Sequence, residues 1–281
     1  MKYKFELQKG SNHVVCPNCG KKTFKPFVES GTNNVVDAFR FGRCERINNC
    51  QYFLYPKTDS EWTPPPLKYI AKPPTDFIPF EIVERSFSNF NNNPFYLWLC
   101  KIFDAETAFN LQKKYNIGTA RNFGTIFWQK DKDSKFRTGK VFYYQNNGKR
   151  DKERASWYVH NRVKENFQLN QVFFGEHLID ENKPVALCES EKTAICMSVF
   201  EPKYTWVASG GAMMLNNERL IRLNRIDKVY PDQGEQQNWT ERTKTFNRKV
   251  DTSVERAFKN GELEKGADIL DLILKNKGIY E

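Results

Sequence analysis

The chain has 281 residues, of which 39% are hydrophobic and 15% aromatic, so it is long enough and apolar enough to bury at least one core. Its 44 Lys and Arg residues outnumber its 34 Asp and Glu residues, which gives a net charge of +10. No apolar run approaches the roughly 18 residues of a membrane span, and the first residues lack the apolar stretch of a secretory signal. We therefore expect no membrane partner and a cytoplasmic location, where the seven cysteines stay reduced and serve metal binding or chemistry.

The positive charge is concentrated in the first part of the chain. Residues 1–165 carry 28 basic and 16 acidic side chains, whereas residues 166–281 carry 16 basic and 18 acidic side chains. This asymmetry is typical of a protein that binds a polyanion with one part and a metal ion with the other. A well-solvated surface gives the same numbers, so charge alone leaves both interpretations open.

Composition divides the chain into four segments, of which the first spans residues 1–60 and contains four cysteines. A proline-rich linker is predicted over residues 61–79, because such runs favour extended polyproline structure. Residues 80–170 indicate a mixed α+β region, with a helix capped by Asp104 and ending before Gly118. Strands are expected there over 125–129 and 140–144, with a turn at Asn147-Gly148.

The last segment, residues 171–281, alternates short apolar runs with helical sequence. The runs at 183–188, 204–208 and 227–230 are typical of buried strands, and residues 191–200 favour a helix. Strands that alternate with helices indicate βαβ units and a parallel sheet. The predicted fold class is therefore α/β, with a parallel-sheet domain at the C-terminal end of the chain.

Two cysteine pairs lie within 35 residues of the first segment. Cys16 and Cys19 form a Cys-x-x-Cys turn, and Cys44 and Cys50 are separated by five residues. Four thiolates suit tetrahedral Zn²⁺, and a tight turn presents two of them at once. We predict a structural zinc ribbon, with reduced cysteines packed in a core as the alternative. His13 is a less favoured ligand and is expected at the surface.

Acidic residues follow two of the predicted parallel strands. Glu189 and Glu191 come directly after the first strand, and Asp232 follows the third. Ligands bind at the carboxyl ends of parallel strands, and carboxylates there suit Mg²⁺ or Mn²⁺. Each residue also has an ordinary interpretation, since Glu191 favours a helix N-terminus and Asp232 a turn. Together they predict a divalent metal site at which Glu189 acts as a general acid or base.

Several of these motifs resemble those of toprim domains. Residues 185–194 resemble the first toprim motif, in which a Glu closes strand one and a second Glu often lies two residues later. Residues 229–232 are similar to the strand that carries the Asp-x-Asp motif, and residues 266–273 to the closing Asp-rich segment of toprim primases. With the N-terminal cysteines, the layout resembles bacterial and phage primases. It is closer still to primase-like toprim proteins of mobile elements in Bacteroides-type bacteria, to which residues 137–140, 157–160 and 174–178 are similar.

The resemblance implies roles for individual residues. Glu189 would be the acid/base residue and Asp232 a catalytic metal ligand. The further candidates for binding the metal cofactor are Glu191, Asp268 and Asp271. The sequence departs from the family pattern at Gly234, where toprim domains have a second Asp. Glu235, Asp268 or Asp271 would then supply the missing carboxylate.

A basic and aromatic stretch lies between residues 130 and 162. Cations neutralise phosphates and aromatic rings stack on unpaired bases, so such a stretch favours binding of single-stranded DNA or RNA. The candidate nucleic-acid-binding residues are Arg137, Lys140, Lys149, Arg150, Trp157 and His160. The alternative is an ordinary sheet, with the aromatic side chains inside and the lysines outside.

Three functions are compatible with these features. The first is a primase-like nucleotidyltransferase that makes primers on single-stranded DNA from nucleoside triphosphates, with catalytic Mg²⁺ or Mn²⁺ and structural Zn²⁺. The second is a toprim enzyme that cleaves phosphodiesters, and the third is a non-catalytic nucleic-acid-binding accessory of replication or mobilisation. The primase resemblance implies a bacterial or phage-infected cell. The sequence shows no helicase segment, so we expect any helicase or replicase partner to be a separate chain.

Overall fold

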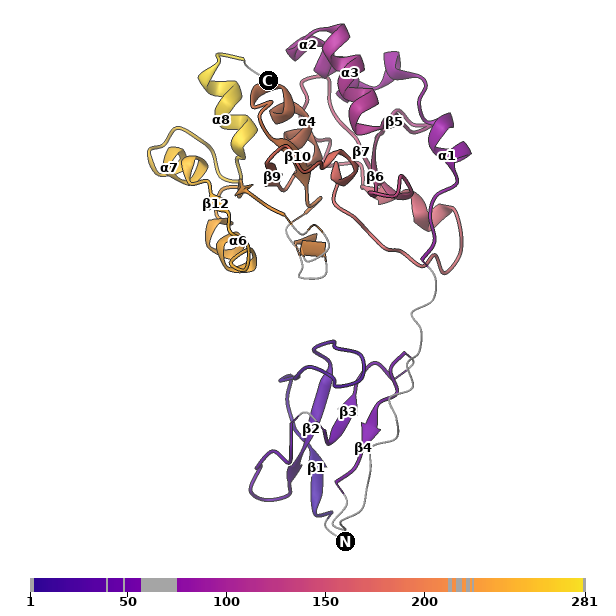
Figure 1. Ribbon diagram of the computed structural model, residues 1–281, viewed down its shortest axis with the longest axis vertical. Coiled ribbons are helices and arrows are strands. Elements are labelled where there is room, and N and C mark those ends of the chain that lie inside the picture. The colour runs from indigo at the N-terminus through magenta and orange to yellow at the C-terminus, as the bar shows by residue number, and fades with distance from the viewer. Residues whose placement is uncertain are drawn as a thin grey trace. The chain divides into compact units, whose positions relative to one another are not determined.

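The computed structural model describes residues 3–38, 40–47, 49–56, 75–211, 214–215, 219–220, 223 and 225–279. The chain divides into two compact units, Met1–Lys72 and Pro73–Glu281, and each is described by itself (Figure 1). Most of the predicted linker, up to residue 74, lies outside the described residues. In the described ranges, every helix is too short or too polar to cross a membrane.

The first unit is an antiparallel sheet, as the ribbon prediction requires. Its strands are β1 (Phe5–Leu7), β2 (Phe24–Glu29), β3 (Gly42–Cys44) and β4 (Phe53–Leu54), and they lie in sequence order. Phe24 is fully buried and packs edge-on against Tyr52 beside the cysteines. Gly42 allows β2 and β3 to pair, because a Cβ there would lie 2.2 Å from the carbonyl oxygen of Lys25.

The second unit begins with helices that lead into an antiparallel sheet. The helices are α1 (Phe80–Arg85), η1 (Phe90–Asn92), α2 (Pro94–Ile102) and α3 (Ala105–Tyr115). The sheet contains β5 (Ile117–Thr119), β6 (Thr125–Lys130), β7 (Phe136–Phe142) and β8 (Trp157–Tyr158), and η2 (Val159–Arg162) follows it. Asp104 caps α3 as predicted, accepting a hydrogen bond from the Thr107 N–H at 2.7 Å. The helix ends at Tyr115, before Gly118 as predicted, and Asn116 adopts the left-handed conformation at its C-terminus.

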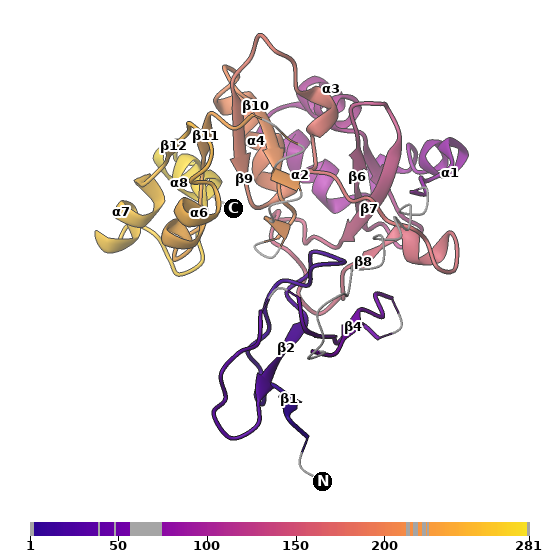
Figure 2. The same cartoon turned by 60° about the horizontal axis from the view of Figure 1, so that its bottom comes forward.

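The predicted parallel sheet is confirmed. It consists of β9 (Val185–Cys188), β10 (Thr205–Ala208), β11 (Lys228–Val229) and β12 (Lys249–Val250), all parallel in the order β10-β9-β11-β12. The short η3 (Glu176–Leu178) precedes the sheet, and the helices of this part are α4 (Glu191–Phe200), α6 (Gln236–Arg242), α7 (Ser253–Lys259) and α8 (Ile269–Asn276). Both views show β12 with α6 and α7 on the side of the sheet away from β10 (Figures 1 and 2).

Alternation along β9 divides the core of this unit. Ala186 and Cys188 face a large core that also contains Phe127 of the antiparallel sheet. Val185 and Leu187 face a smaller core on the other side of the parallel sheet. The large core joins the two sheets, so it spans the boundary that we predicted near residue 170.

Candidate functional site

The four cysteines of the first unit converge on one point. The Cys16 and Cys50 sulfurs are 3.7 Å apart, those of Cys19 and Cys44 are 3.9 Å apart, and all four lie within 4.8 Å of one another. Tetrahedral zinc with Zn–S bonds of about 2.3 Å requires sulfurs about 3.8 Å apart. The cluster therefore fits a zinc ion with only small shifts of the sulfurs, which supports the predicted structural Zn²⁺.

Local hydrogen bonds shape this cluster. The Gly20 N–H donates to the Cys16 carbonyl at 2.9 Å, and Gly20 has a φ of +66°, as a reversal after the cysteine turn requires. The Asn18 amide lies 3.4 Å from the Cys50 sulfur, as a second-layer donor would. Burial raises the pKa of the Cys16 thiol to about 12, so a bound metal ion has to displace its proton. His13 is not one of the four candidate ligands, and its Nε2 is hydrogen-bonded to a Glu45 carboxylate oxygen at 2.6 Å.

Carboxylates gather at the carboxyl edge of the parallel sheet. Glu189 directly follows β9, and Asp232 follows the neighbouring strand β11. Burial and the negative charges of Asp268, Glu189, Asp271 and Glu235, in this order, raise the pKa of Asp232 to about 9. A group of carboxylates that repel one another in this way stabilises a bound cation.

Asp268 and Asp271 also have a structural role at the start of α8. One Asp268 oxygen accepts the N–H groups of Leu270 at 2.8 Å and Asp271 at 3.1 Å. The other Asp268 oxygen accepts a hydrogen bond from the Thr193 hydroxyl, and Asp271 accepts the Asp268 N–H at 2.8 Å. This capping box fixes both residues at the sheet edge. Both oxygens of Asp268 are used by the fold, so its effect on Asp232 comes through its charge.

Glu191 lies at a buried contact between the two sheets of the second unit. It is the first residue of α4 and only 3% exposed, and burial raises its pKa against the opposing effects of Lys140 and Arg150. Lys140 of β7 donates to the Gly210 carbonyl at 2.5 Å, in the glycine turn that follows β10. The antiparallel sheet therefore contributes a cation to this edge of the parallel sheet.

Gln129 was missed by the sequence reasoning. It lies on β6, is 1% exposed, and neither its amide nitrogen nor its amide oxygen has a hydrogen-bond partner among the described residues. Its amide nitrogen lies 3.8 Å from the position of a Cβ built on Gly210, and a Glu191 oxygen lies 2.9 Å from the same position. A polar residue inside the apolar run 125–129 was the available signal, but it did not show that Gln129 and Glu191 would both lie beside Gly210.

The carboxylates are not arranged as closely as the cysteines. Among the residues that the structure describes, the four cysteine sulfurs are the ligand atoms that gather tightly enough to share a metal ion as they stand. A divalent ion at this edge would be held by carboxylates such as Glu189, Asp232 and Glu235, and these would have to move closer together to share it. The donor set, all oxygen, fits Mg²⁺ or Mn²⁺ rather than a softer metal.

Gly234, which follows Asp232 by two residues, has a backbone conformation that favours glycine. Gly234 has a φ of +87°, which an Asp would adopt only with strain, and its N–H donates to Glu255 at 3.3 Å. Beside it lies an open cavity of about 730 Å³. Its lining residues are Gly234, Gln236, Gln237, Thr240, Glu241, Glu255 and Lys259. The cavity thus lies against Gly234, the position at which the toprim resemblance led us to expect a second carboxylate.

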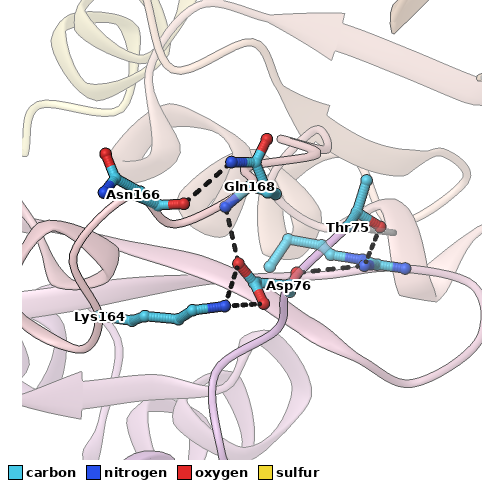
Figure 3. A network of polar contacts seen from close by, with 6 residues as sticks. Thr75, Asp76, Lys164, Asn166 and Gln168 are labelled. Atoms are coloured by element: carbon cyan, nitrogen blue, oxygen red, sulfur yellow. Dashed lines mark hydrogen bonds and ion pairs between the residues drawn. The ribbon is translucent and has the colours of Figure 1, made fainter. Parts of the chain in front are cut away.

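Arg137, a candidate for phosphate binding, is instead held by the fold. It is 7% exposed, and its Nε donates to Asp131 at 2.6 Å. Its Nη1 donates to the Thr75 hydroxyl at 3.0 Å and to the Asp76 carbonyl at 3.3 Å. Figure 3 shows Asp76 held in turn by Lys164 and Gln168. These bonds fasten the first described residues of the second unit to the antiparallel sheet.

The other candidate nucleic-acid-binding residues lie closer to the surface. Lys149 and Arg150 are exposed in the turn after β7, and the Arg150 guanidinium lies 3.9 Å from the centre of the Phe142 ring. Trp157 is half-buried on the edge strand β8. His160 is half-buried, with Nδ1 2.7 Å from the Thr138 hydroxyl, and burial lowers its pKa, so the ring is neutral near pH 7.

Replacing Asp232 by Asn is expected to raise the free energy of unfolding of the metal-free protein by at least about 1 kcal/mol at pH 7. The folded-state pKa of about 9 lies above the ordinary value of 3.8, so the wild type loses stability as the pH rises through this interval. Urea denaturation at pH 7 and pH 4 measures the gain, which should vanish at pH 4.

Asp251→Asn is the matched control for this experiment. Asp251 pairs with Lys228 at 2.8 Å, and although its partial burial opposes the shift, hydrogen bonds from Lys228 and Ser253 lower its pKa. Its replacement should therefore destabilise the protein at pH 7. Equal stability of Asp232→Asn and the wild type at pH 7 would show that the carboxylates do not repel one another as described.

The fold and the cysteine site define an α/β protein with an N-terminal zinc ribbon. The chain belongs to the family described as Domain of unknown function (DUF6371), whose model matches residues 93–233. The model of a zinc beta-ribbon finger matches residues 2–64. None of the curated proteins matches the sequence.

Two solved structures are similar to this chain. The primase fragment of the bacteriophage T7 primase-helicase protein has a TM-score of 0.41 at 13% identity, over 90% of this chain and 96% of that one. The Aquifex aeolicus primase, in its zinc-binding and RNA polymerase domains, has a TM-score of 0.32 at 11% identity, over 80% of this chain and 66% of that one.

Proposed function

We propose that the protein is a primase-like nucleotidyltransferase with a toprim-type carboxylate site. The observation that carries the proposal is the position of Glu189 and Asp232 at the carboxyl ends of the neighbouring parallel strands β9 and β11. The charges of Asp268, Asp271 and Glu235 act on the same point. Their sequence motifs resemble those of toprim primases, and this resemblance supports the same interpretation.

The chemistry divides among these residues. Mg²⁺ or Mn²⁺, when bound, supplies a positive charge that polarises a phosphoryl oxygen and stabilises the leaving group. Asp232 and Glu235 would hold the ion, while Asp268 and Asp271 keep the edge negative. Glu189 would accept a proton from the attacking hydroxyl as a general base. Glu191 would keep its buried position beside Lys140 and orient the glycine turn.

The remaining partners follow from the same proposal. Nucleoside triphosphates would be the substrates and single-stranded DNA the template. Lys149 and Arg150 would contact phosphates, while Trp157 and His160 would face bases. The zinc ribbon would add a second contact to the template. Unwinding would come from a separate helicase or replicase.

Primer synthesis on circular single-stranded DNA tests this proposal. We expect labelled nucleoside triphosphates to be incorporated into short products when Mg²⁺ or Mn²⁺ is present, and chelation by EDTA to abolish them. Incorporation that does not depend on the template would count against primer synthesis. Mg²⁺-dependent nicking of the circle without nucleotides would instead identify the phosphodiester-cleaving function.

One observation favours the non-catalytic alternative. Among the described residues, the carboxylates do not gather as tightly as the cysteines, and Gly234 takes the place of the second Asp. An accessory protein of replication would bind single-stranded DNA and neither incorporate nucleotides nor bind Mg²⁺. Calorimetric titration with Mg²⁺ and Mn²⁺ distinguishes the two functions, since the nucleotidyltransferase requires measurable binding.

A further inference from the structure

We propose that the turn between β5 and β6 presents Phe123 as a stacking platform for an unpaired base of single-stranded DNA. Arg154 beside the turn, and Arg162 further along the same run of contacts, would bind the phosphates. This inference rests on the nucleic-acid partner of the proposed function and names a surface for it.

The backbone of Phe123 has an unusual conformation for an aromatic residue. Its φ is +58°, in the left-handed region that disfavours bulky side chains. The other non-glycine residues with positive φ in the described part of the chain are all Asn, Asp, Gln or Ser. The turn is closed by hydrogen bonds from Phe123 N–H to the Ala120 carbonyl at 2.9 Å and from Ala120 N–H to the Gly124 carbonyl at 2.8 Å. A large aromatic side chain therefore occupies a position where a small polar residue is usual.

The fold does not use the Phe123 ring as a core residue. Phe123 is 47% exposed and belongs to none of the apolar clusters among the described residues, so packing explains only part of the backbone strain. Strained residues that packing does not explain are found at ligand contacts. An exposed aromatic ring held by a rigid turn is suited to stacking, because its orientation is fixed before a base arrives.

The surroundings of the turn indicate an anionic partner. Arg154 donates to the Asn122 carbonyl at 3.2 Å, and its guanidinium lies 3.5 Å from the centre of the Tyr143 ring. The Trp157 indole N–H donates to the Tyr143 hydroxyl at 3.2 Å, and the guanidinium of Arg162 lies 3.7 Å from the centre of the Trp157 ring. The contacts thus run without interruption from the turn to Arg162.

Charge favours a nucleic acid over an apolar protein surface. Arg121, Arg154 and Arg162 are exposed, and none of the ion pairs between described residues engages them. A guanidinium carries five N–H donors, and stacking on a ring leaves their in-plane directions open to phosphate oxygens. Exposed cations that alternate with aromatic rings match a strand of phosphates and unstacked bases.

Fluorescence anisotropy with a labelled oligothymidylate and the full chain tests this proposal. Phe123→Asn removes the ring and leaves a residue that tolerates positive φ, so the variant should melt at the wild-type temperature or above. Its affinity for the oligonucleotide should fall about tenfold, or about 1.4 kcal/mol. The matched control is Phe109→Ala, because Phe109 is 46% exposed on α3 and lies under Lys113; this variant should bind like the wild type.

Arg154→Ala and Arg162→Ala should each reduce the salt dependence of binding by about 0.7 in the slope of log affinity against log salt. Binding of Phe123→Asn within twofold of the wild type would overturn the inference, and so would an effect seen with RNA alone. Primer synthesis is measured separately. If the wild type synthesises primers while Phe123→Asn binds the oligonucleotide with wild-type affinity, the inference fails and the proposed function stands. If Phe123→Asn loses affinity for the oligonucleotide while the wild type synthesises no primers, the inference stands and the proposed function fails.

Discussion

Glu189→Gln is expected to reduce primer synthesis at least about a hundredfold, the lower end of what a positioned general base contributes. Gln keeps the size of the side chain and its hydrogen-bonding oxygen but cannot accept a proton. Glu189 is half-buried at the end of β9, so the amide should be accommodated without unfolding the sheet. Initial rates of nucleotide incorporation at saturating template, for the variant and the wild type, measure the effect.

Glu181→Gln is the control for this variant. Glu181 is exposed and precedes the start of β9, whereas Glu189 follows the end of this strand at the carboxylate edge. It should support synthesis at the wild-type rate. Glu189→Gln should also bind single-stranded DNA as the wild type does, which would separate chemistry from binding. Robust synthesis by Glu189→Gln would remove Glu189 from the mechanism and leave the carboxylate edge without an assigned base.

Removal of zinc is expected to unfold the first unit and leave the second intact. The cluster at the metal site consists of Cys16, Phe24, Cys44 and Cys50, and the other buried core residues described in this unit are Phe5, Phe27 and Val28, so the core that remains without the metal is small. Structural zinc typically contributes about 10–16 kcal/mol of apparent binding free energy at neutral pH, more than a unit of this size gains from its core. The wild type should contain one zinc per chain by elemental analysis.

Cys44→Ser should lower the zinc content below about half an equivalent and abolish the transition of the first unit in thermal unfolding. Cys100→Ser is the matched control, because Cys100 lies half-buried in α2 of the second unit. This variant should keep its zinc. A wild-type protein with less than about half an equivalent of zinc, or a first unit that stays folded in chelator, would contradict the structural role of the metal.

Local patterns made several parts of the structure predictable. The spacing of Cys16, Cys19, Cys44 and Cys50 identified the metal cluster, because a tetrahedral ion restricts how four thiolates can be arranged along a chain. The helix over residues 191–200 was predicted with its observed bounds, and the Asp104 cap is confirmed. The strand β12 was missed because two residues are too few to show a period.

The burial of each basic side chain decided its role, and this burial could not be predicted from the sequence. Arg137 and Arg150 stand in the same basic stretch, yet Arg137 is enclosed with Asp131 while Arg150 is exposed over Phe142. Arg137 is enclosed because Thr75 and Asp76 lie against it, and residues 164–168 hold Asp76 in place. Such contacts join residues far apart in the chain, and a local pattern carries no information about them.

The sequence by itself determined the zinc ligands, the parallel strands and the acidic residues that follow them, because each depends on spacing or periodicity within a short segment. Only the tertiary structure decided which carboxylates act on Asp232, because Asp268 comes from a helix 36 positions later in the chain. It also decided that Gln129 and Glu191 both lie beside Gly210 and that Phe123 is exposed with a strained backbone. Proximity across sheets and the conformation of a turn arise only when the whole unit is packed.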